Sequence, residues 1–373
     1  MGCRQIAWNL TGLEVFVVRT FICTCGEKIF FDDSCCNNCG SQVGHCPVCR
    51  NVVALIGNEQ QGYRCGNPAC GTPLLKCHNY LVHGVCNRCV VYPTEGLPPP
   101  QPLCDCCRYN QVIPDLTIPG NQEKWGRLEA AKRRLFFQLD LLGLPRGTAA
   151  DGFDPPLSFD FKADDYGIWG TTNYQGVTEQ VLTGHLNGKI TINIREADSV
   201  EREKLRVQFG EKNRTLIGHF RHEIAHYYWD LMIKGQREPA CKQVFGDHDM
   251  SYAAALESHY QSGPPEQWEE RFASAYASVH PWEDFAETFA FYLEIVSTLD
   301  TAHHTRLGGP GVTGDLDEML TAYRELGDAL NIMNRSMGLL DHASRPISAT
   351  ITEKLRFVHD LIQSARQAAA YSQ

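Results

Sequence analysis

The chain has 373 residues, with 34 Lys and Arg against 44 Asp and Glu, which gives a formal net charge of -10. This acidic balance disfavours nucleic-acid binding, because phosphate recognition normally needs a basic surface. The first apolar stretch is broken by Glu14 and Arg19, and no apolar run approaches the length of a membrane span. We therefore expect no secretory signal and no membrane contact, and we expect the protein in the cytoplasm.

The cysteines are concentrated at the amino-terminal end, where sixteen of the seventeen precede Tyr109. Many are spaced as CxxC, the spacing of zinc ribbons, and in a reducing compartment thiolate-bound zinc explains them better than disulfides do. Residues 1–118 are formally neutral, so residues 119–373 carry the whole net charge. We therefore favour structural zinc, with a protein-docking or substrate-screening role, over DNA or RNA binding.

Proximity along the chain groups these cysteines into zinc sites. The first site contains Cys23, Cys25, Cys36 and Cys39. The second site contains Cys46, Cys49, Cys65 and Cys70. Since the first site begins with CxC where a regular ribbon has CxxC, a nearby residue remains an alternative to Cys23.

The larger domain is expected to begin at residue 119, after which a helix runs from Gln122 to Gly143. Strands are predicted from Leu157 to about Asp198, where the alternating segment Gly188–Ile194 indicates one half-buried strand. Apolar residues at helical spacing predict two carboxy-terminal helices, over about 316–330 and 351–362. The predicted domains are thus a ribbon module over 1–118 and a second domain over 119–373.

His222, Glu223 and His226 form an HExxH motif. Apolar residues recur around it at spacings of three and four, which indicates a helix. Such a helix places both imidazoles on one face beside a carboxylate, as a zinc ion and its attacking water require. Ordinary helix histidines remain the alternative for the motif alone. His219 lies on the same face and is expected to pack or to support a ligand.

A second helix is expected from about Pro281. Glu283 and Glu287 are four residues apart and share one face of this helix. One carboxylate can bind zinc while the other hydrogen-bonds a ligand imidazole. Asp284 is the alternative ligand. A negatively charged first turn that complements the helix dipole explains Glu283 and Asp284 but not Glu287.

An HExxH helix followed by an ExxxE helix resembles the gluzincin metallopeptidases. More closely, residues 215–230 (TLIGHFRHEIAHYYWD) and 274–293 (SAYASVHPWEDFAETFAFYL), with 113–116 (IPDL) and 131–135 (AKRRL), resemble a bacterial family of zinc-binding metallopeptidases with an amino-terminal zinc ribbon. The likeness extends from about Phe21 to about Thr301. It implies an α+β fold, in which a small zinc-ribbon module precedes a gluzincin-like metallopeptidase domain.

By this resemblance, and in keeping with the chemistry, His222, His226 and Glu283 bind the catalytic zinc. Glu223 is then the general base that takes a proton from the attacking water, and Glu287 supports a ligand histidine.

The resemblance also implies how the transition state and the substrate are bound. Tyr276 would stabilise the developing oxyanion, as a tyrosine does in lethal-factor-like gluzincins, and His280 competes for this role. In gluzincins, an edge strand at the place of Gly188–Ile194 binds the extended substrate backbone.

The family's downstream cysteines correspond to a third ribbon site, made of Cys77, Cys86, Cys104 and Cys107, whereas the second site is an insertion relative to the family's pattern. The expected cofactors are one catalytic and about three structural Zn²⁺ ions. The cysteines left over are Cys3, Cys35, Cys89, Cys106 and Cys241. Three of them, Cys35, Cys89 and Cys106, lie within three residues of a proposed ligand and can exchange with it.

These assignments predict a zinc-dependent peptidase that acts on a peptide or protein substrate. Two alternatives remain open. One is a zinc hydrolase of another amide, for which the same ligands serve. The other is a zinc-ribbon adaptor whose HExxH domain binds without cutting and whose ribbons dock a protein partner. Glu223 argues against the adaptor, because a metal scaffold has no use for a base at this position.

Overall fold

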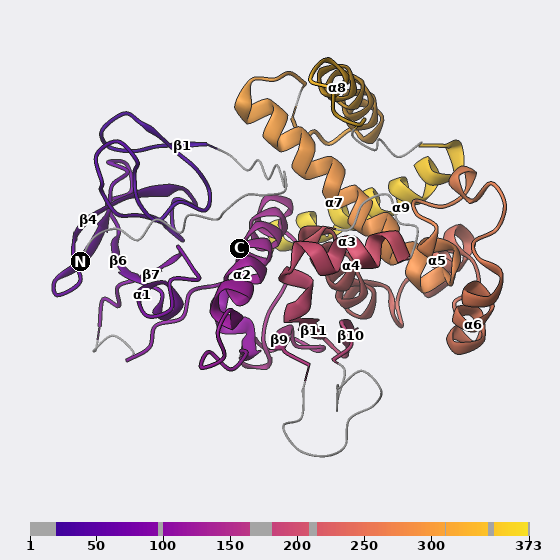
Figure 1. Ribbon diagram of the computed structural model, residues 1–373, viewed down its shortest axis with the longest axis horizontal. Helices are drawn as coiled ribbons and strands as arrows, with labels where there is room; N and C mark the ends of the chain where they lie inside the picture. Colours follow the sequence, from indigo (N-terminus) through magenta and orange to yellow (C-terminus); the bar gives the residue numbers. More distant parts are fainter. Residues whose placement is uncertain are drawn as a thin grey trace. The chain divides into compact units, whose positions relative to one another are not determined.

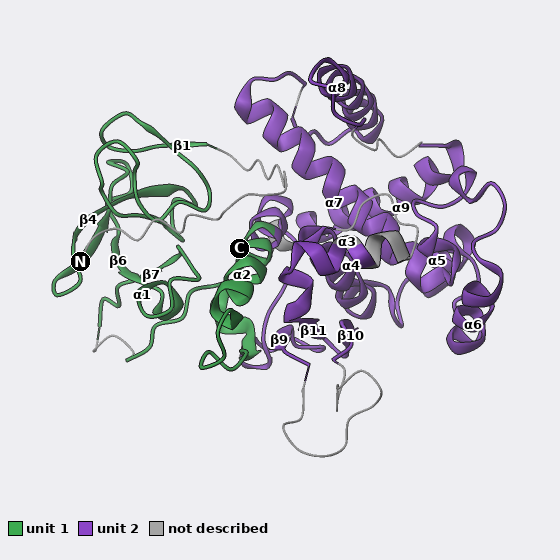
Figure 2. Ribbon diagram, viewed as in Figure 1, with its two compact units in different colours: residues 1–134 green, residues 135–373 purple. Residues whose placement is uncertain are grey.

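The computed structural model describes residues 20–95, 100–164, 181–208, 215–309, 311–341 and 347–371. Cys3 lies outside these ranges. The chain forms two compact units, Met1–Arg134 and Leu135–Gln373 (Figure 2). The division falls within helix α2 (Asn121–Leu142). The sequence-based boundary at 118/119 stays a prediction.

The first unit is built from short strands. β1 (Phe21–Ile22) pairs with β2 (Lys28–Ile29), and a five-stranded antiparallel sheet contains β3 (Val43–His45), β4 (Val52–Asn58), β5 (Gly62–Cys65), β6 (Pro73–Lys76) and β7 (Cys89–Val91). Helix α1 (His78–Leu81), a 3₁₀ helix (Cys107–Tyr109) and β8 (Asn110–Val112) follow.

Glycines shape the turns that carry the cysteines of the first ribbon site. Gly26 and Gly40 have φ angles of +89° and +70°, which L residues with a side chain rarely adopt. Their amides donate to the carbonyls of Cys23 and Cys36, each at 2.9 Å. These tight turns direct neighbouring cysteine side chains toward a common point.

The second unit contains a sheet in which β11 (Lys189–Asn193) lies between β10 (Gly184–Leu186) and β9 (Ser158–Lys162). The strand predicted over 188–194 is therefore confirmed, but its expected place at the edge is wrong. Asn187 and Gly188 both have positive φ angles, +48° and +80°, as a two-residue hairpin turn requires. This turn folds β10 back onto β11, so β10, and not β11, takes an edge position in the described sheet.

Helices make up most of the second unit (Figure 1). Its α-helices are α3 (Ser199–Gln208), α4 (Leu216–Tyr228), α5 (Glu238–Phe245), α6 (Tyr252–Ser262), α7 (Pro281–Thr305), α8 (Leu316–Ser336) and α9 (Ala349–Tyr371). A π-helical turn (Trp229–Ile233) continues α4, and 3₁₀ helices lie at Ala149–Asp151, Ile194–Ala197, Trp268–Glu270 and Tyr276–Ser278. The α+β class predicted from the sequence is confirmed.

The two predicted motif helices pack side by side (Figure 1). α4 begins where the Thr215 hydroxyl accepts a hydrogen bond from the Gly218 amide at 3.1 Å. α7 begins with Pro281 in its first turn and with His280 as the capping residue. Buried aromatic rings, among them Phe220 of α4, fill the space between α4 and the sheet.

In the part of the chain that the structure describes, no helix is both long enough and apolar enough to cross a membrane.

Candidate metal centre

The structure brings His222 and His226 of α4 together with Glu283 of α7. The two Nε2 atoms are 3.1 Å apart, and Glu283 Oε2 lies 3.1 Å from His222 Nε2 and 3.5 Å from His226 Nε2. One helical turn separates the histidines, and Glu283 reaches them from the first turn of α7. The candidate ligand atoms of the three residues predicted from the sequence thus lie close together.

These residues fit a zinc ion. Tetrahedral zinc with bonds of about 2.0–2.1 Å to nitrogen and oxygen holds its ligand atoms about 3.3 Å apart, close to the separations seen here. Glu283 Oε2 is buried and receives no well-aligned hydrogen bond from the described residues. A buried carboxylate oxygen without a donor is costly, so a cation at this point would supply the missing partner.

Neighbouring side chains orient the three candidate ligands. His222 Nδ1 donates to Glu287 Oε1 at 2.7 Å. The lone pair on His222 Nε2 is then directed toward His226 and Glu283, where a metal ion would bind. Tyr252 donates its hydroxyl proton to Glu283 Oε1 at 2.8 Å. Burial opposes protonation of His222, yet the carboxylates of Glu283 and Glu287 raise its pKa well above the ordinary value. The same negative charge would favour a bound metal cation.

Glu223 lies in the same turn of α4, only 8% exposed. Its Oε2 atom is buried and has no hydrogen-bond partner among the described residues. Burial raises the pKa of this carboxyl group, so it holds a proton more readily than an exposed glutamate does. These properties suit a group that accepts a proton during a reaction.

The two candidates for oxyanion stabilisation differ in the hydrogen bonds they already make. The Tyr276 ring centre lies 6.0 Å from that of His222, and its hydroxyl lies 3.4 Å from the Tyr252 hydroxyl. His280 caps α7: its Nδ1 accepts from the Trp282 amide and its Nε2 contacts the Met250 carbonyl, both at 3.1 Å. Both ring nitrogens of His280 therefore already contact backbone atoms. The Tyr276 hydroxyl makes only a long contact with another hydroxyl among the described residues, so it can still donate to a substrate.

Two other predicted candidates do not join the group. Asp284 Oδ2 accepts from Lys354 Nζ of α9 at 2.6 Å, which directs this carboxylate away from the role of alternative ligand. His219 pairs with Glu196, in agreement with a supporting rather than a ligand position.

Two residues of the metal centre had not been predicted. Tyr252 is distant in sequence from both motifs, and no local pattern marks it. His185 lies on β10, with its ring centre 6.2 Å from that of His226. The Asn187–Gly188 turn could have placed β10 beside β11, but nothing in the sequence places β10 beside α4.

In the first unit, the twelve predicted cysteine ligands form three clusters of four, with the grouping expected from the sequence. Sulfur–sulfur distances are 3.7 Å for Cys23–Cys39 and Cys25–Cys36, 3.9 Å for Cys46–Cys70, 3.7 Å for Cys49–Cys65 and 3.8 Å for Cys86–Cys104. Four thiolates around zinc at about 2.3 Å lie about 3.8 Å apart, whereas a disulfide needs about 2.05 Å. The clusters therefore fit zinc.

The left-over cysteines Cys35, Cys89, Cys106 and Cys241 are buried and lie outside these clusters. Among the described residues, none of Cys35, Cys89 and Cys106, the alternatives that the sequence left open, takes the place of a proposed ligand in a cluster. They contribute as small core residues.

An HExxH helix, a buried glutamate from a second helix and thiolate clusters define a zinc-binding protein, and comparison with known families agrees. Residues 121–361 match the family described as "Putative zinc-binding metallo-peptidase", and residues 20–118 match a zinc-ribbon domain. The chain belongs to this zinc-binding metallo-peptidase family.

Similar proteins occur in mycobacteria. Uncharacterized proteins of Mycobacterium bovis and of two strains of Mycobacterium tuberculosis are each 35% identical to this chain over 356 residues. The aligned region covers 92% of this chain and 95% of each relative. No solved structure matches the chain.

Proposed function

We propose that this protein is a gluzincin-like, zinc-dependent peptidase that hydrolyses peptide bonds, with Glu223 as the general base. The observation that carries the proposal is the position of Glu223. It lies between the two histidines in sequence, is buried, and has an oxygen with no hydrogen-bond partner among the described residues. A site that only stores zinc gains nothing from an unpaired buried carboxylate there.

In the proposed site, different side chains bind the metal, orient its ligands and transfer the proton. His222, His226 and Glu283 hold zinc, and Glu287 and Tyr252 keep His222 and Glu283 in place. Zinc, when bound, activates water and polarises the substrate carbonyl. Glu223 Oε2 accepts the water proton and delivers it to the leaving amine.

Tyr276 supplies the donor for the developing oxyanion. Tyr252 has already given its only hydroxyl proton to Glu283, so the proton in the contact between the two tyrosines belongs to Tyr276. At 3.4 Å this contact is weak, and the proton can transfer to a better acceptor. Burial raises the pKa of Tyr276, which keeps its phenol protonated and able to donate.

A peptide is the substrate class that the sheet favours. β10 is an edge strand of the described sheet, and the ring centre of its His185 lies 6.2 Å from that of His226. An extended peptide added to such an edge forms main-chain hydrogen bonds without demanding particular side chains. A small amide would use none of these contacts.

The ribbon clusters suit a reducing compartment, because their sulfurs are spaced for thiolate-bound zinc and not for disulfides. We propose that the enzyme acts in the cytoplasm and that the ribbon unit docks a protein partner or substrate. Residues 1–118 show no excess of basic residues, which speaks against nucleic acid as that partner.

The proposal is tested by the cleavage of proteome-derived peptides, analysed by mass spectrometry, together with the zinc content of two variants. Glu223→Gln should keep the metal and lose hydrolysis, because Glu223 donates no ligand atom. Glu283→Ala should lose zinc from the centre and activity together. A chelator should abolish cleavage by the unmodified protein.

Peptides that stay intact while small amides are hydrolysed would replace the peptidase with another amidohydrolase. If zinc-loaded protein hydrolyses neither peptides nor small amides, we would conclude that the HExxH domain binds without cutting. Equal loss of metal in both variants would show that the roles of Glu223 and Glu283 are misassigned.

A further inference from the structure

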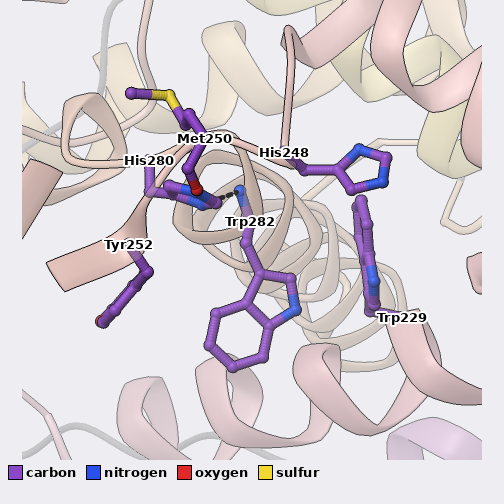
Figure 3. A pocket seen from close by; sticks show the side chains of 6 residues that line it. All are labelled: Trp229, His248, Met250, Tyr252, His280 and Trp282. Atoms are coloured by element: carbon purple, nitrogen blue, oxygen red, sulfur yellow. Dashed lines mark hydrogen bonds between the residues drawn. The ribbon is translucent and has the colours of Figure 1, made fainter. Parts of the chain in front are cut away.

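A pocket of about 230 Å³ opens beside the candidate metal centre. It is lined by the side chains of Trp229, His248, Met250, Tyr252, His280 and Trp282. Figure 3 shows Trp282 at its centre, with Tyr252 on one side and Trp229 on the other. The lining comes from the end of the HExxH helix, the segment before and at the start of α6, and the start of α7. We refer to these six residues as the aromatic pocket.

Two of the lining residues also touch the metal centre. The Trp282 ring stacks on the His226 ring, with centres 3.7 Å apart and an angle of 30° between the planes. The Tyr252 hydroxyl donates to Glu283 Oε1 at 2.8 Å, while its ring forms a wall of the pocket. The side chain of Tyr252 therefore connects the pocket directly to Glu283, one of the three candidate zinc ligands.

The chemistry of the lining selects an apolar ligand. Three aromatic rings and a thioether provide most of it, and no carboxylate is among the six residues. Both ring nitrogens of His280 already make hydrogen bonds to the backbone. Burial of an aromatic or large aliphatic side chain here would gain area-dependent free energy and favourable ring contacts. A cation would lack a counter-charge.

The volume limits the ligand to one side chain. Cavities that hold whole small molecules are usually about 300–1,000 Å³, and this pocket is smaller. It has room for several waters, which occupy roughly 30 Å³ each. One large side chain that displaces those waters is the occupant that matches both volume and lining.

We propose that the aromatic pocket is the subsite that sets cleavage specificity and that it binds a large apolar side chain, aromatic or aliphatic, of the residue next to the cleaved bond. This inference rests on the proposed peptidase function, because Trp282 and Tyr252 of the pocket contact His226 and Glu283, the residues proposed to hold the zinc ion that would act on the peptide bond. The enzyme should therefore cut beside Phe, Tyr, Trp or Leu in preference to Ala or Gly.

The first test measures kcat/KM for matched peptides that differ only by Phe or Ala at the residue next to the cleaved bond. The Phe peptide should be favoured at least about tenfold, the size of discrimination that an apolar pocket provides. Met250→Lys places an ammonium group in the pocket and should remove most of this preference. Met333→Lys, a change at a methionine of α8 that is 52% exposed against 48% for Met250, should keep it.

The second test measures binding without catalysis. In zinc-loaded Glu223→Gln protein, N-acetyl-phenylalanine amide should change the fluorescence of Trp229 and Trp282 in a saturable way, and N-acetyl-alanine amide should not. Met250→Lys in the same background should weaken the response at least about tenfold. Circular dichroism confirms that each variant is folded.

The outcomes separate the pocket from the proposed function. Cleavage without a preference for apolar residues, or a preference that survives Met250→Lys, would show that the aromatic pocket does not set specificity. The proposed peptidase function would still stand. If no peptide is cut, the peptidase proposal fails, and the inference that rests on it fails too. Saturable binding of the phenylalanine amide would then still mark an apolar ligand site. Tighter binding of a cationic amide would show that the ligand class is wrong.

Discussion

At the scale of single residues, the metal centre depends on a pair of tyrosines with different tasks. Tyr252 is fixed by its hydrogen bond to Glu283 and helps hold a ligand. Among the described residues, the Tyr276 hydroxyl has only the long contact to the Tyr252 hydroxyl, so its proton remains available. The two phenols lie next to each other, and in the proposed reaction only Tyr276 donates to the charge that develops on the substrate.

Tyr276→Phe tests this difference. Because the lost hydroxyl acts only on the developing oxyanion, kcat should fall by roughly ten- to a thousandfold with zinc content and fold unchanged. Tyr252→Phe should instead lower zinc affinity by roughly 10–100-fold, as expected when the partner of a ligand is removed. Steady-state kinetics and competition with a metal chelator measure the two effects.

His280→Ala is the matched comparison for Tyr276→Phe. It should reduce kcat less, because Nδ1 of His280 already caps α7 and its Nε2 contacts the Met250 carbonyl. Near-full activity of Tyr276→Phe with loss of activity in His280→Ala would assign the oxyanion to the histidine. If both variants stay active, neither side chain stabilises the oxyanion.

At the scale of elements, the start of α7 contacts two other helices, α4 and α9, through residues that are close together in sequence. Glu283 and Glu287 reach α4, whereas Asp284, between them in sequence, reaches Lys354 of α9. Lys354 is 5% exposed and also donates to the Arg271 carbonyl at 2.6 Å. This buried pair thus fixes the orientation of the first turn of α7, from which Glu283 reaches the histidines.

Lys354→Met should destabilise the second unit by about 3 kcal/mol, because Asp284 and the Arg271 carbonyl would stay buried without their donor. Urea unfolding followed by circular dichroism measures the change. Arg356→Met on the same helix removes an exposed ion pair with Asp317 and should leave stability almost unchanged. Equal effects of the two substitutions would mean that the buried pair adds nothing specific.

The sequence predicted those features that local pattern determines. α4 and α7, their shared face and the three cysteine clusters follow from spacings of a few residues, so His222, His226, Glu283 and the cysteines could be named in advance. Tyr252 and the pairing of Asp284 with Lys354 could not, because each joins segments that only the folded chain brings together. The alternating pattern of residues 188–194 indicates a strand but not its neighbours, and the Asn187–Gly188 turn places β10 outside it.

At the scale of the whole molecule, the two units contain two different kinds of candidate zinc site. The first unit holds closed clusters of four thiolates, and the second holds an open group of two imidazoles and one carboxylate. Closed tetrahedral sites stabilise a fold, while three protein ligands leave a position for water. Because small zinc modules draw folding free energy from their metal, we expect zinc to supply part of the folding free energy of the first unit.

The zinc content of the purified protein tests this division. About four zinc ions per chain are expected, three held by thiolates and one at the His222–His226–Glu283 group. A mild chelator should remove one ion first and leave the circular dichroism spectrum unchanged, because that ion lies at an open site. A thiol-reactive mercurial should then release the other three and unfold the first unit. Glu283→Ala should lower the count by one, and Cys49→Ser should weaken a thiolate cluster. Fewer than two zinc ions, with cysteines oxidised to disulfides, would contradict the ribbon assignment.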